Sequence, residues 1–171
     1  MLTPGEAQVF WDFYAKSAAA LFRRAFVLCN GHRPNAEDAH QETYLKIMDA
    51  WARVSPLEDR ARMGYLTTTL LNVMRERWRR TNVVWPLEGV DAVANLPDMA
   101  DHMMTKELYQ EVCRRLATLP PQQALVMTLF AFEGLTFNEI AEELRLSPIT
   151  VRGHMAQARR VLRPQGGVGE A

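Results

Sequence analysis

The sequence predicts an all-α fold in which two small helical domains are joined by a flexible linker. Apolar residues recur along most of the chain at the three- and four-residue spacing of a helix, and no strand pattern persists. The 171 residues, 48% hydrophobic and 23% charged, suit a globular protein with one good core or two small ones. Between 82 and 103 the helical pattern gives way to an acidic segment containing proline and glycine, which is typical of an interdomain linker.

The first domain, residues 1–81, is expected to hold three helices, at about 6–29, 35–53 and 62–80. Asn30 and Gly31 favour the left-handed turn that ends the first helix. Asn35 is the expected N-cap of the second helix, which stops before Ser55 and Pro56.

The second domain, residues 104–165, is expected to be helical with breaks at Pro120-Pro121 and at Gly134, and to close with a helical hairpin at 135–163. In this hairpin Thr136 and Glu139 have the spacing of a capping box, and Ser147 precedes a proline at the first position of the next helix. The glycine-rich tail 166–171 is expected to be flexible.

The hairpin has the pattern of a DNA-binding helix-turn-helix. Val151, Met155 and Ala158 mark a buried stripe on its second helix, and residues 145–163 contain five arginines and no acid. A basic helix that begins at a sharp turn can enter the major groove of DNA. An ordinary hairpin with a solvated arginine face is the alternative that these residues alone leave open.

The net charge of zero conceals three differently charged segments. Residues 35–59 hold six acids against two bases, whereas residues 60–80 hold six arginines against one acid. The two basic segments, 60–80 and 145–163, predict two separate contacts with a polyanion, and the acidic segment predicts a basic protein partner.

The third predicted helix carries a polar stripe of Thr68, Asn72, Arg75 and Arg79 opposite its apolar face. Such amide and guanidinium groups can bind phosphates and unpaired bases. Tyr65 and Trp78 could stack on an exposed base, or could simply pack into a small core.

Several other classes of protein find no support in the sequence. There is no nucleophile motif, phosphate-binding loop or metal-ligand cluster, so we expect no catalytic residue, no cofactor and no metal, and hence no enzyme. Cys29 and Cys113 are expected to be buried, reduced thiols, and His32, His40 and His102 to lie at the surface. Neither a signal peptide nor a membrane-length apolar run is found, which predicts a cytoplasmic protein without membrane insertion.

Three segments, in this order, carry a family resemblance over about residues 7–163. They are AEDAHQETYLKIMDAW at 36–51, YLTTTLLNVMRERWRR at 65–80, and the stretch from LPPQQALVMTLF to MAQARRVL that ends at 162. The chain resembles the extracytoplasmic-function (ECF) sigma factors of the sigma-70 family, in regions 2.1 to 2.2, 2.3 to 2.4 and 4. The resemblance implies an alternative sigma factor that binds bacterial core RNA polymerase and directs transcription initiation at promoter DNA. It also implies an anti-sigma factor as a partner.

The resemblance assigns roles to three sets of residues. The polymerase-docking set lies on the second helix and comprises Asp38, Gln41, Glu42 and Leu45. The minus-10 set, which would melt the promoter and hold a flipped base, comprises Tyr65, Thr68, Asn72, Arg75, Arg79 and Arg80. The minus-35 set, which would lie in the major groove, comprises Thr150, Arg152, Gly153, His154, Gln157 and Arg160.

The chain departs from the usual family pattern at Tyr65, Thr67 and Thr68, and again at Gly153 and His154. The first three bear on promoter melting and the last two on promoter sequence. Two alternatives therefore stay open at this point: a sigma-like decoy or adaptor that binds a regulator without melting DNA, and a plain helix-turn-helix regulator.

Overall fold

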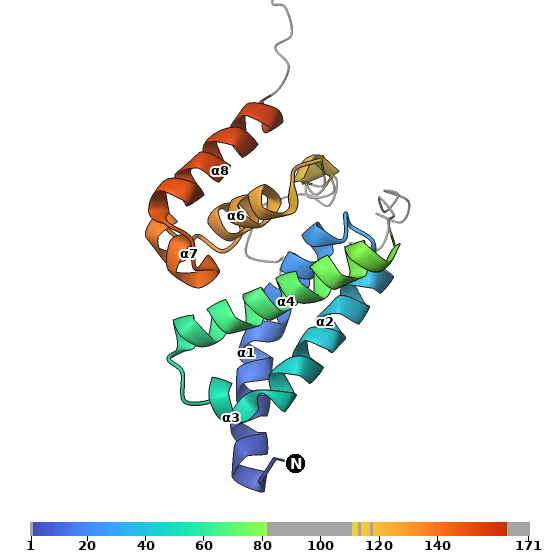
Figure 1. Ribbon diagram of the computed structural model, residues 1–171, viewed down its shortest axis with the longest axis vertical. Coiled ribbons are helices and arrows are strands. Elements are labelled where there is room, and N and C mark those ends of the chain that lie inside the picture. The colour runs from blue at the N-terminus through green and yellow to red at the C-terminus, as the bar shows by residue number, and fades with distance from the viewer. Residues whose placement is uncertain (1, 82–110, 113, 117, 164–171) are drawn as a thin grey trace, which may run out of the picture.

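The computed structural model describes residues 2–81, 111–112, 114–116 and 118–163, and within them it contains helices and no strand (Figure 1). The helices are α1 (Pro4–Leu28), α2 (Arg33–Asp49), α3 (Trp51–Val54), α4 (Asp59–Thr81), α6 (Pro121–Ala131), α7 (Phe137–Leu144) and α8 (Pro148–Leu162). The predicted all-α fold is therefore confirmed. The predicted linker 82–103 and tail 166–171 lie outside the described residues. None of the helices in the described part is long and apolar enough to cross a membrane.

Helix α1 begins and ends at local signals that the sequence contains. Thr3 accepts a hydrogen bond from the Glu6 backbone N–H, and the Glu6 carboxylate accepts one from the Thr3 N–H, so both orphan donors are satisfied. At the other end Asn30 and Gly31 have φ angles of 54° and 77°, and the Gly31 N–H donates to the Phe26 carbonyl. The predicted left-handed turn is thus confirmed.

The predicted bounds of the next two helices need correction. His32, not Asn35, is the N-cap of α2, because its Nδ1 accepts a hydrogen bond from the Asn35 N–H and the helix starts at Arg33. The predicted helix to residue 53 breaks at Ala50, and the short α3 that follows buries Trp51. Helix α4 starts at Asp59, three residues before the predicted start. Arg62 supports this start by donating to the Ser55 and Leu57 carbonyls, at 2.8 and 2.7 Å.

An aromatic cluster joins α1, α2 and α3. The ring of Trp51 lies 5.1 Å from that of Phe10, edge to face, and 5.7 Å from that of Phe13. Tyr44 of α2 packs 6.4 Å from Phe10, and its hydroxyl lies 2.7 Å from the Ser17 hydroxyl. Such ring pairs add stability beyond the area that they bury.

The helical hairpin is built as its caps predict. The Thr136 and Glu139 capping box is present, and the Ser147 side chain accepts from the Thr150 N–H at the start of α8. Val151, Met155 and Ala158 are buried, as the stripe predicts. Arg145 forms the turn with a φ of 54°, a conformation that non-glycine residues adopt uncommonly.

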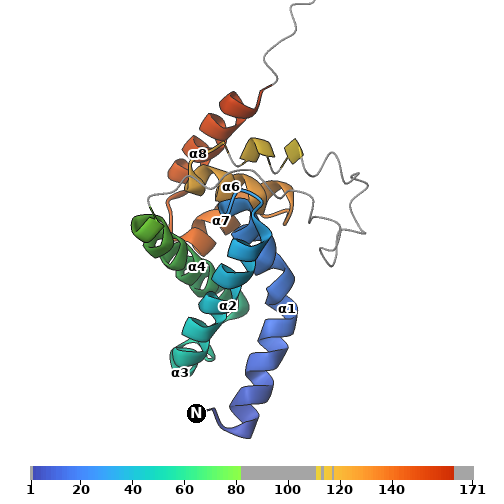
Figure 2. The same ribbon diagram turned by 90° about the vertical axis from the view of Figure 1, so that its right-hand side faces the viewer.

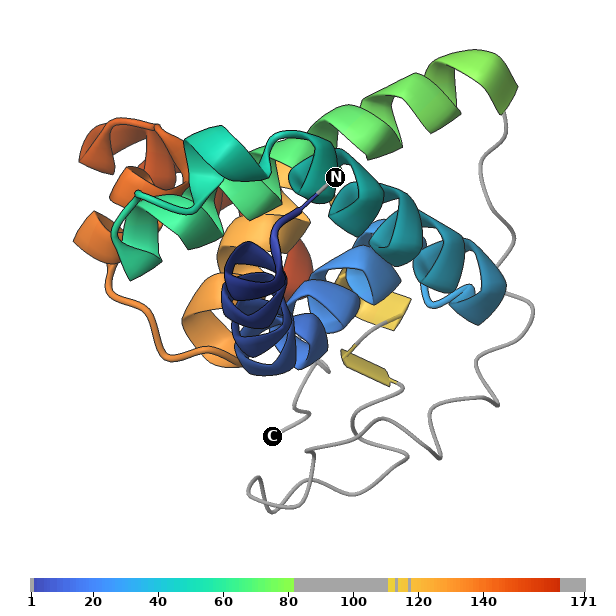
Figure 3. The same ribbon diagram turned by 90° about the horizontal axis from the view of Figure 1, so that it is seen from below.

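Helices α6, α7 and α8 gather at one end of the molecule, and the N-terminal part of α1 lies with α3 toward the other (Figures 1 and 2). The beginning of α4 lies beside the hairpin, and α4 then runs away from it across the molecule (Figure 3). Apolar side chains of α1, α2 and α4 form one core with those of α6, α7 and α8. The two groups of helices are therefore packed against each other.

Candidate protein and nucleic-acid interfaces

Helix α8 presents a polar face to solvent. Five members of the minus-35 set are exposed, namely Thr150, Arg152, Gly153, Gln157 and Arg160. His154 is half-buried. Gln157 is held in place by a hydrogen bond of 2.7 Å from Gln123 of α6. Most of the set can therefore reach a ligand without rearrangement of the hairpin.

Charged side chains hold both helices of the hairpin against neighbouring helices. A hydrogen bond from the Thr136 backbone N–H lowers the pKa of the Glu139 carboxyl, and Arg60 of α4 lies 2.8 Å from the same carboxylate. On α8, the Arg159 guanidinium lies 5.6 Å from the centre of the Phe130 ring, a cation–π contact that ties α8 to α6.

The minus-10 set follows the outer side of α4. Its exposed members are Asn72, Arg75, Arg79 and Arg80, while Tyr65 and Thr68 are half-buried. The Arg75 guanidinium donates to the Asn72 side-chain oxygen at 3.2 Å, so the two polar groups form one unit. Tyr65 and Trp78 both pack partly against the core, and neither ring is fully enclosed.

A hollow of about 380 Å³ lies between α2 and α4 and is lined by Tyr65, Thr69 and Asn72 on the α4 side. Lys46 and Asp49 line it from α2, and Arg53 lines it from α3. Its size is within the range of small-ligand sites. The sequence alone does not indicate that these α2 and α3 residues lie opposite Asn72, because their position depends on how the helices pack.

Several arginines of the basic segment 60–80 are neutralised within the chain. Arg77 donates to Glu42 of α2 at 2.9 Å, Arg62 pairs with Asp59, and Arg80 pairs with Glu76. The count of six arginines therefore overstates the charge that this segment offers to a polyanion. Thr67 is buried under α7 and does not face the polar stripe.

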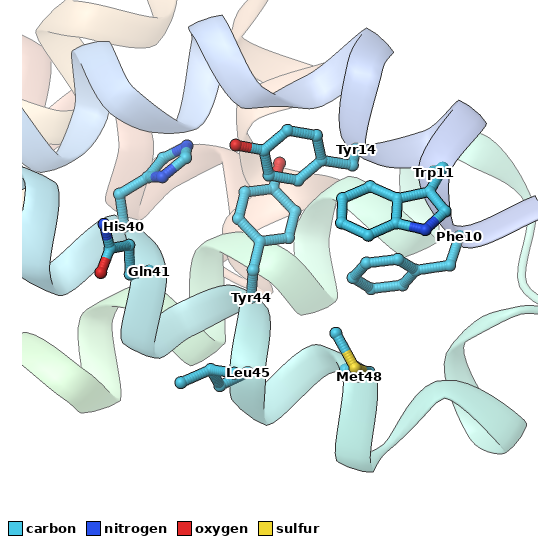
Figure 4. A pocket seen from close by; sticks show the side chains of 8 residues that line it. All are labelled: Phe10, Trp11, Tyr14, His40, Gln41, Tyr44, Leu45 and Met48. Carbon is cyan, nitrogen blue, oxygen red and sulfur yellow. The ribbon is translucent and has the colours of Figure 1, made fainter. Parts of the chain in front are cut away.

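Two of the four members of the polymerase-docking set line an apolar groove between α1 and α2 (Figure 4). Gln41 and Leu45 line this groove of about 250 Å³ together with Phe10, Trp11, Tyr14, His40, Tyr44 and Met48. Trp11 and Leu45 are 55% and 61% exposed, and Met48 is exposed as well, so this groove presents several large apolar groups to solvent at one place. Asp38 is also exposed, whereas Glu42 is half-buried and engaged by Arg77. Sequence reasoning missed Trp11, although an aromatic between Phe10 and Phe13 could have signalled a second apolar face.

His40 does not lie freely at the surface as predicted. It is half-buried among the rings of Tyr14, Phe22 and Tyr44, its Nε2 lies 3.2 Å from the Ala18 carbonyl oxygen, and burial lowers its pKa. Cys29 is a buried free thiol whose pKa burial raises to about 12, as expected for an inert cysteine. Cys113 and His102 lie outside the described residues.

Comparison with protein families finds two regions of one family. The sigma-70 region 2 model matches residues 13–83, and the sigma-70 region 4 model matches residues 109–162. Together the two matches cover more than half of the chain. The chain belongs to the sigma-70 family. The region 2 match contains α2, α3 and α4 with the minus-10 and polymerase-docking sets, although Phe10 and Trp11 of the groove precede it, and the region 4 match contains the helix-turn-helix.

Relatives of this sigma-70 family member agree with that assignment. It is 26% identical over 154 residues to an ECF RNA polymerase sigma factor, SigE, of Mycolicibacterium smegmatis, a match that covers 90% of this chain and 60% of the relative. The chain thus spans about 60% of that relative's length. Regions 2 and 4, which the family models match, both lie within the chain that is similar to this ECF sigma factor.

The fold of this sigma-70 family member is also that of a solved sigma factor. The structure is the sigma factor RpoE of Bartonella quintana in complex with the anti-sigma factor NepR. The two folds agree with a TM-score of 0.65 at 20% identity, over 90% of this chain and 94% of the other.

Proposed function

We propose that the protein is an alternative sigma factor that binds bacterial core RNA polymerase and directs promoter-specific transcription initiation. One observation carries the proposal. The two exposed cationic surfaces, on α4 and α8, lie in the two segments of the chain that match regions 2 and 4 of one family. Residues 1–81 then form the polymerase-docking and minus-10 domain, and residues 104–165 form the minus-35 domain. Because polymerase and promoters are cytoplasmic in bacteria, the protein works in the cytoplasm.

The minus-10 surface is proposed to capture an extruded base. Extrusion of a base from DNA costs a few kcal/mol, which stacking and hydrogen bonds to the extruded base can offset. The half-buried Tyr65 ring at the hollow between α2 and α4 offers the stacking surface, and the Asn72 amide offers donors and an acceptor for a base edge. Lys46 and Arg53 at the same hollow offer charge for the flanking phosphates.

The polymerase is proposed to dock on the groove between α1 and α2. Leu45 and Trp11 supply the exposed apolar area, and Asp38 supplies negative charge at the side for a basic partner. Interfaces with an apolar centre and a charged rim are typical of protein complexes. An anti-sigma factor would compete for surfaces of the same domains.

A run-off transcription assay with bacterial core polymerase tests the proposed function. The purified protein should make initiation promoter-dependent on fragments selected from its own genome by transcript mapping. A decoy would bind polymerase or a regulator without producing transcripts, and a plain helix-turn-helix regulator would bind DNA without needing polymerase. Failure to bind core polymerase at all would overturn the proposal.

Replacing Leu45 or Trp11 by alanine should weaken the affinity for core polymerase by about 30-fold, the effect of losing an interface hot spot of about 2 kcal/mol. Fluorescence anisotropy of labelled protein titrated with core polymerase measures this. Val9→Ala is the matched control, because Val9 is also an exposed apolar residue of α1 but lies outside the groove. Equal loss in the control would place the docking surface elsewhere.

Arg152→Ala should reduce binding to the cognate minus-35 site by about 1–3 kcal/mol and binding to other DNA by much less, if the Arg152 guanidinium contacts a guanine. Competition binding with cognate and scrambled duplexes at one salt concentration measures the difference. A uniform loss on all duplexes would show that Arg152 contacts only phosphate.

A further inference from the structure

A buried ionic cluster joins region 2 to region 4. Arg24 of α1 is 1% exposed, and its guanidinium binds Glu133 through two hydrogen bonds, of 2.8 and 2.5 Å. The same guanidinium forms an ion pair with Glu143 of α7 and a hydrogen bond with Thr67 of α4. Helix α1, helix α4 and the segment 133–143, which are far apart in the sequence, thus meet at one side chain.

The cluster depends on all of its members. Burial by itself would lower the pKa of Arg24, but the hydrogen bonds and charges of Glu133 and Glu143 outweigh burial and raise it. The two carboxylates are only 11% and 4% exposed, so loss of the arginine would leave two buried negative charges side by side. Separation of Glu133 and α7 from α1 and α4 would instead return these carboxylates to water.

Helices α4 and α7 pack closely against each other around the cluster. A Cβ atom at Gly64 of α4 would lie 2.8 Å from the backbone carbonyl oxygen of Glu143, so the two helices approach as closely as a glycine permits. Leu66 and Leu70 of α4 share the apolar core with Ile140 of α7. At the rim, Arg60 pairs with Glu139 across the same boundary.

This packed arrangement cannot span a promoter. Elements centred at minus-10 and minus-35 are about 25 base pairs apart, which is about 85 Å along B-DNA at 3.4 Å per base pair. In the structure α7 contacts both α4 and α8. Even laid end to end, these three helices would extend only about 70 Å at 1.5 Å per residue, and they are packed side by side.

We propose that the Arg24 cluster is an ionic latch that holds the chain in a closed state, in which its two DNA-binding faces cannot occupy one promoter together. The latch must release before α4 and α8 bind minus-10 and minus-35 DNA. This proposal rests on the proposed function for its biological meaning, but the closed state itself can be tested without polymerase or DNA.

The experiment measures the distance between spin labels on α1 and α8 of the full chain by pulsed electron paramagnetic resonance. Labels are placed at Lys16→Cys and Ala156→Cys, both exposed positions, with Cys29 and Cys113 replaced by serine. The labelled chain that keeps Arg24, Glu133 and Glu143 should give a single narrow distribution, at a short distance between the two labels. Arg24→Ala should shift the ratio of closed to open molecules by about 100-fold, giving a broad, long distribution.

A second variant keeps the charges of the latch. Gly64→Ala favours the helical state of α4, because alanine is the better helix former, but places a methyl group against the α7 backbone. It should therefore open the chain with unchanged helicity by circular dichroism. Gly5→Ala and Arg23→Ala are the controls: Gly5 has open space around it, and Arg23 is the neighbour of Arg24 on α1. Both should stay closed.

The outcomes separate the latch from the proposed function. Short distances that persist in Arg24→Ala and Gly64→Ala would overturn the latch, as would a short distance in a complex with polymerase and promoter that makes transcripts. The latch would be supported if both variants are open and if the label-to-label distance in the chain with intact latch residues increases when polymerase and promoter are bound. Open variants combined with no transcription from any promoter would leave the latch standing and remove the proposed function.

Discussion

Replacing Asn72 and Arg75 together by alanine is expected to reduce promoter opening about 100-fold while leaving the affinity for core polymerase unchanged. The two side chains are exposed on α4, are joined by a hydrogen bond, and Asn72 lines the hollow between α2 and α4. Each lost contact to a base or phosphate should cost about 1–2 kcal/mol, and about 2.7 kcal/mol corresponds to 100-fold. Permanganate reactivity of unpaired thymines and the yield of run-off transcript measure the opening.

Lys16→Ala is the control for this double variant, because it removes an exposed cation from α1, away from the hollow. It should open promoters like the wild type. Normal permanganate reactivity in the double variant would contradict the proposed minus-10 surface. A loss of polymerase binding would instead show that α4 contributes to docking.

Local signals in the sequence predict the ends of several helices because each signal acts over a few residues. The capping box at Thr136 and Glu139, the serine cap at Ser147 and the turn at Asn30 are all present in the structure. Each satisfies backbone groups that the helix cannot satisfy itself, so neighbouring sequence alone determines the outcome. His32 was missed because histidine is not among the residues that usually cap a helix.

Contacts between distant segments could not be predicted in this way. The break at Ala50 follows no proline or glycine and instead turns Trp51 into the aromatic cluster. Arg24 sits in an apolar stretch of α1, and nothing near it in the sequence indicates that Glu133 and Glu143 surround it. A single sequence indicates helical periodicity and caps, but it does not indicate which helix faces pack against each other.

The same limit applies to the candidate surfaces. Helical projection places Asn72 and Arg75 on one stripe, and both are exposed there. It cannot show that Lys46 of α2 lines the same hollow, or that Trp11 of α1 and Leu45 of α2 line one groove, because both arrangements arise from tertiary packing.

Trp51→Ala is expected to lower the free energy of unfolding by about 3–5 kcal/mol, as is typical for removal of a large buried aromatic. Trp51 is 1% exposed and contacts both Phe10 and Phe13, so the substitution leaves a cavity where three helices meet. Domains are commonly stable by only about 5–15 kcal/mol, so a large part of the margin is lost. Urea denaturation followed by circular dichroism measures the change.

Two further tryptophan variants separate packing from partner binding. Trp51→Phe keeps a ring in the cluster and removes an indole N–H that is buried without a hydrogen-bond partner among the described residues, so its cost should be well below that of alanine. Trp11→Ala, at a ring that is 55% exposed, should cost little stability while weakening polymerase binding. If Trp11→Ala destabilised the fold as much as Trp51→Ala, the groove would be part of the core and its exposure would not indicate a docking surface.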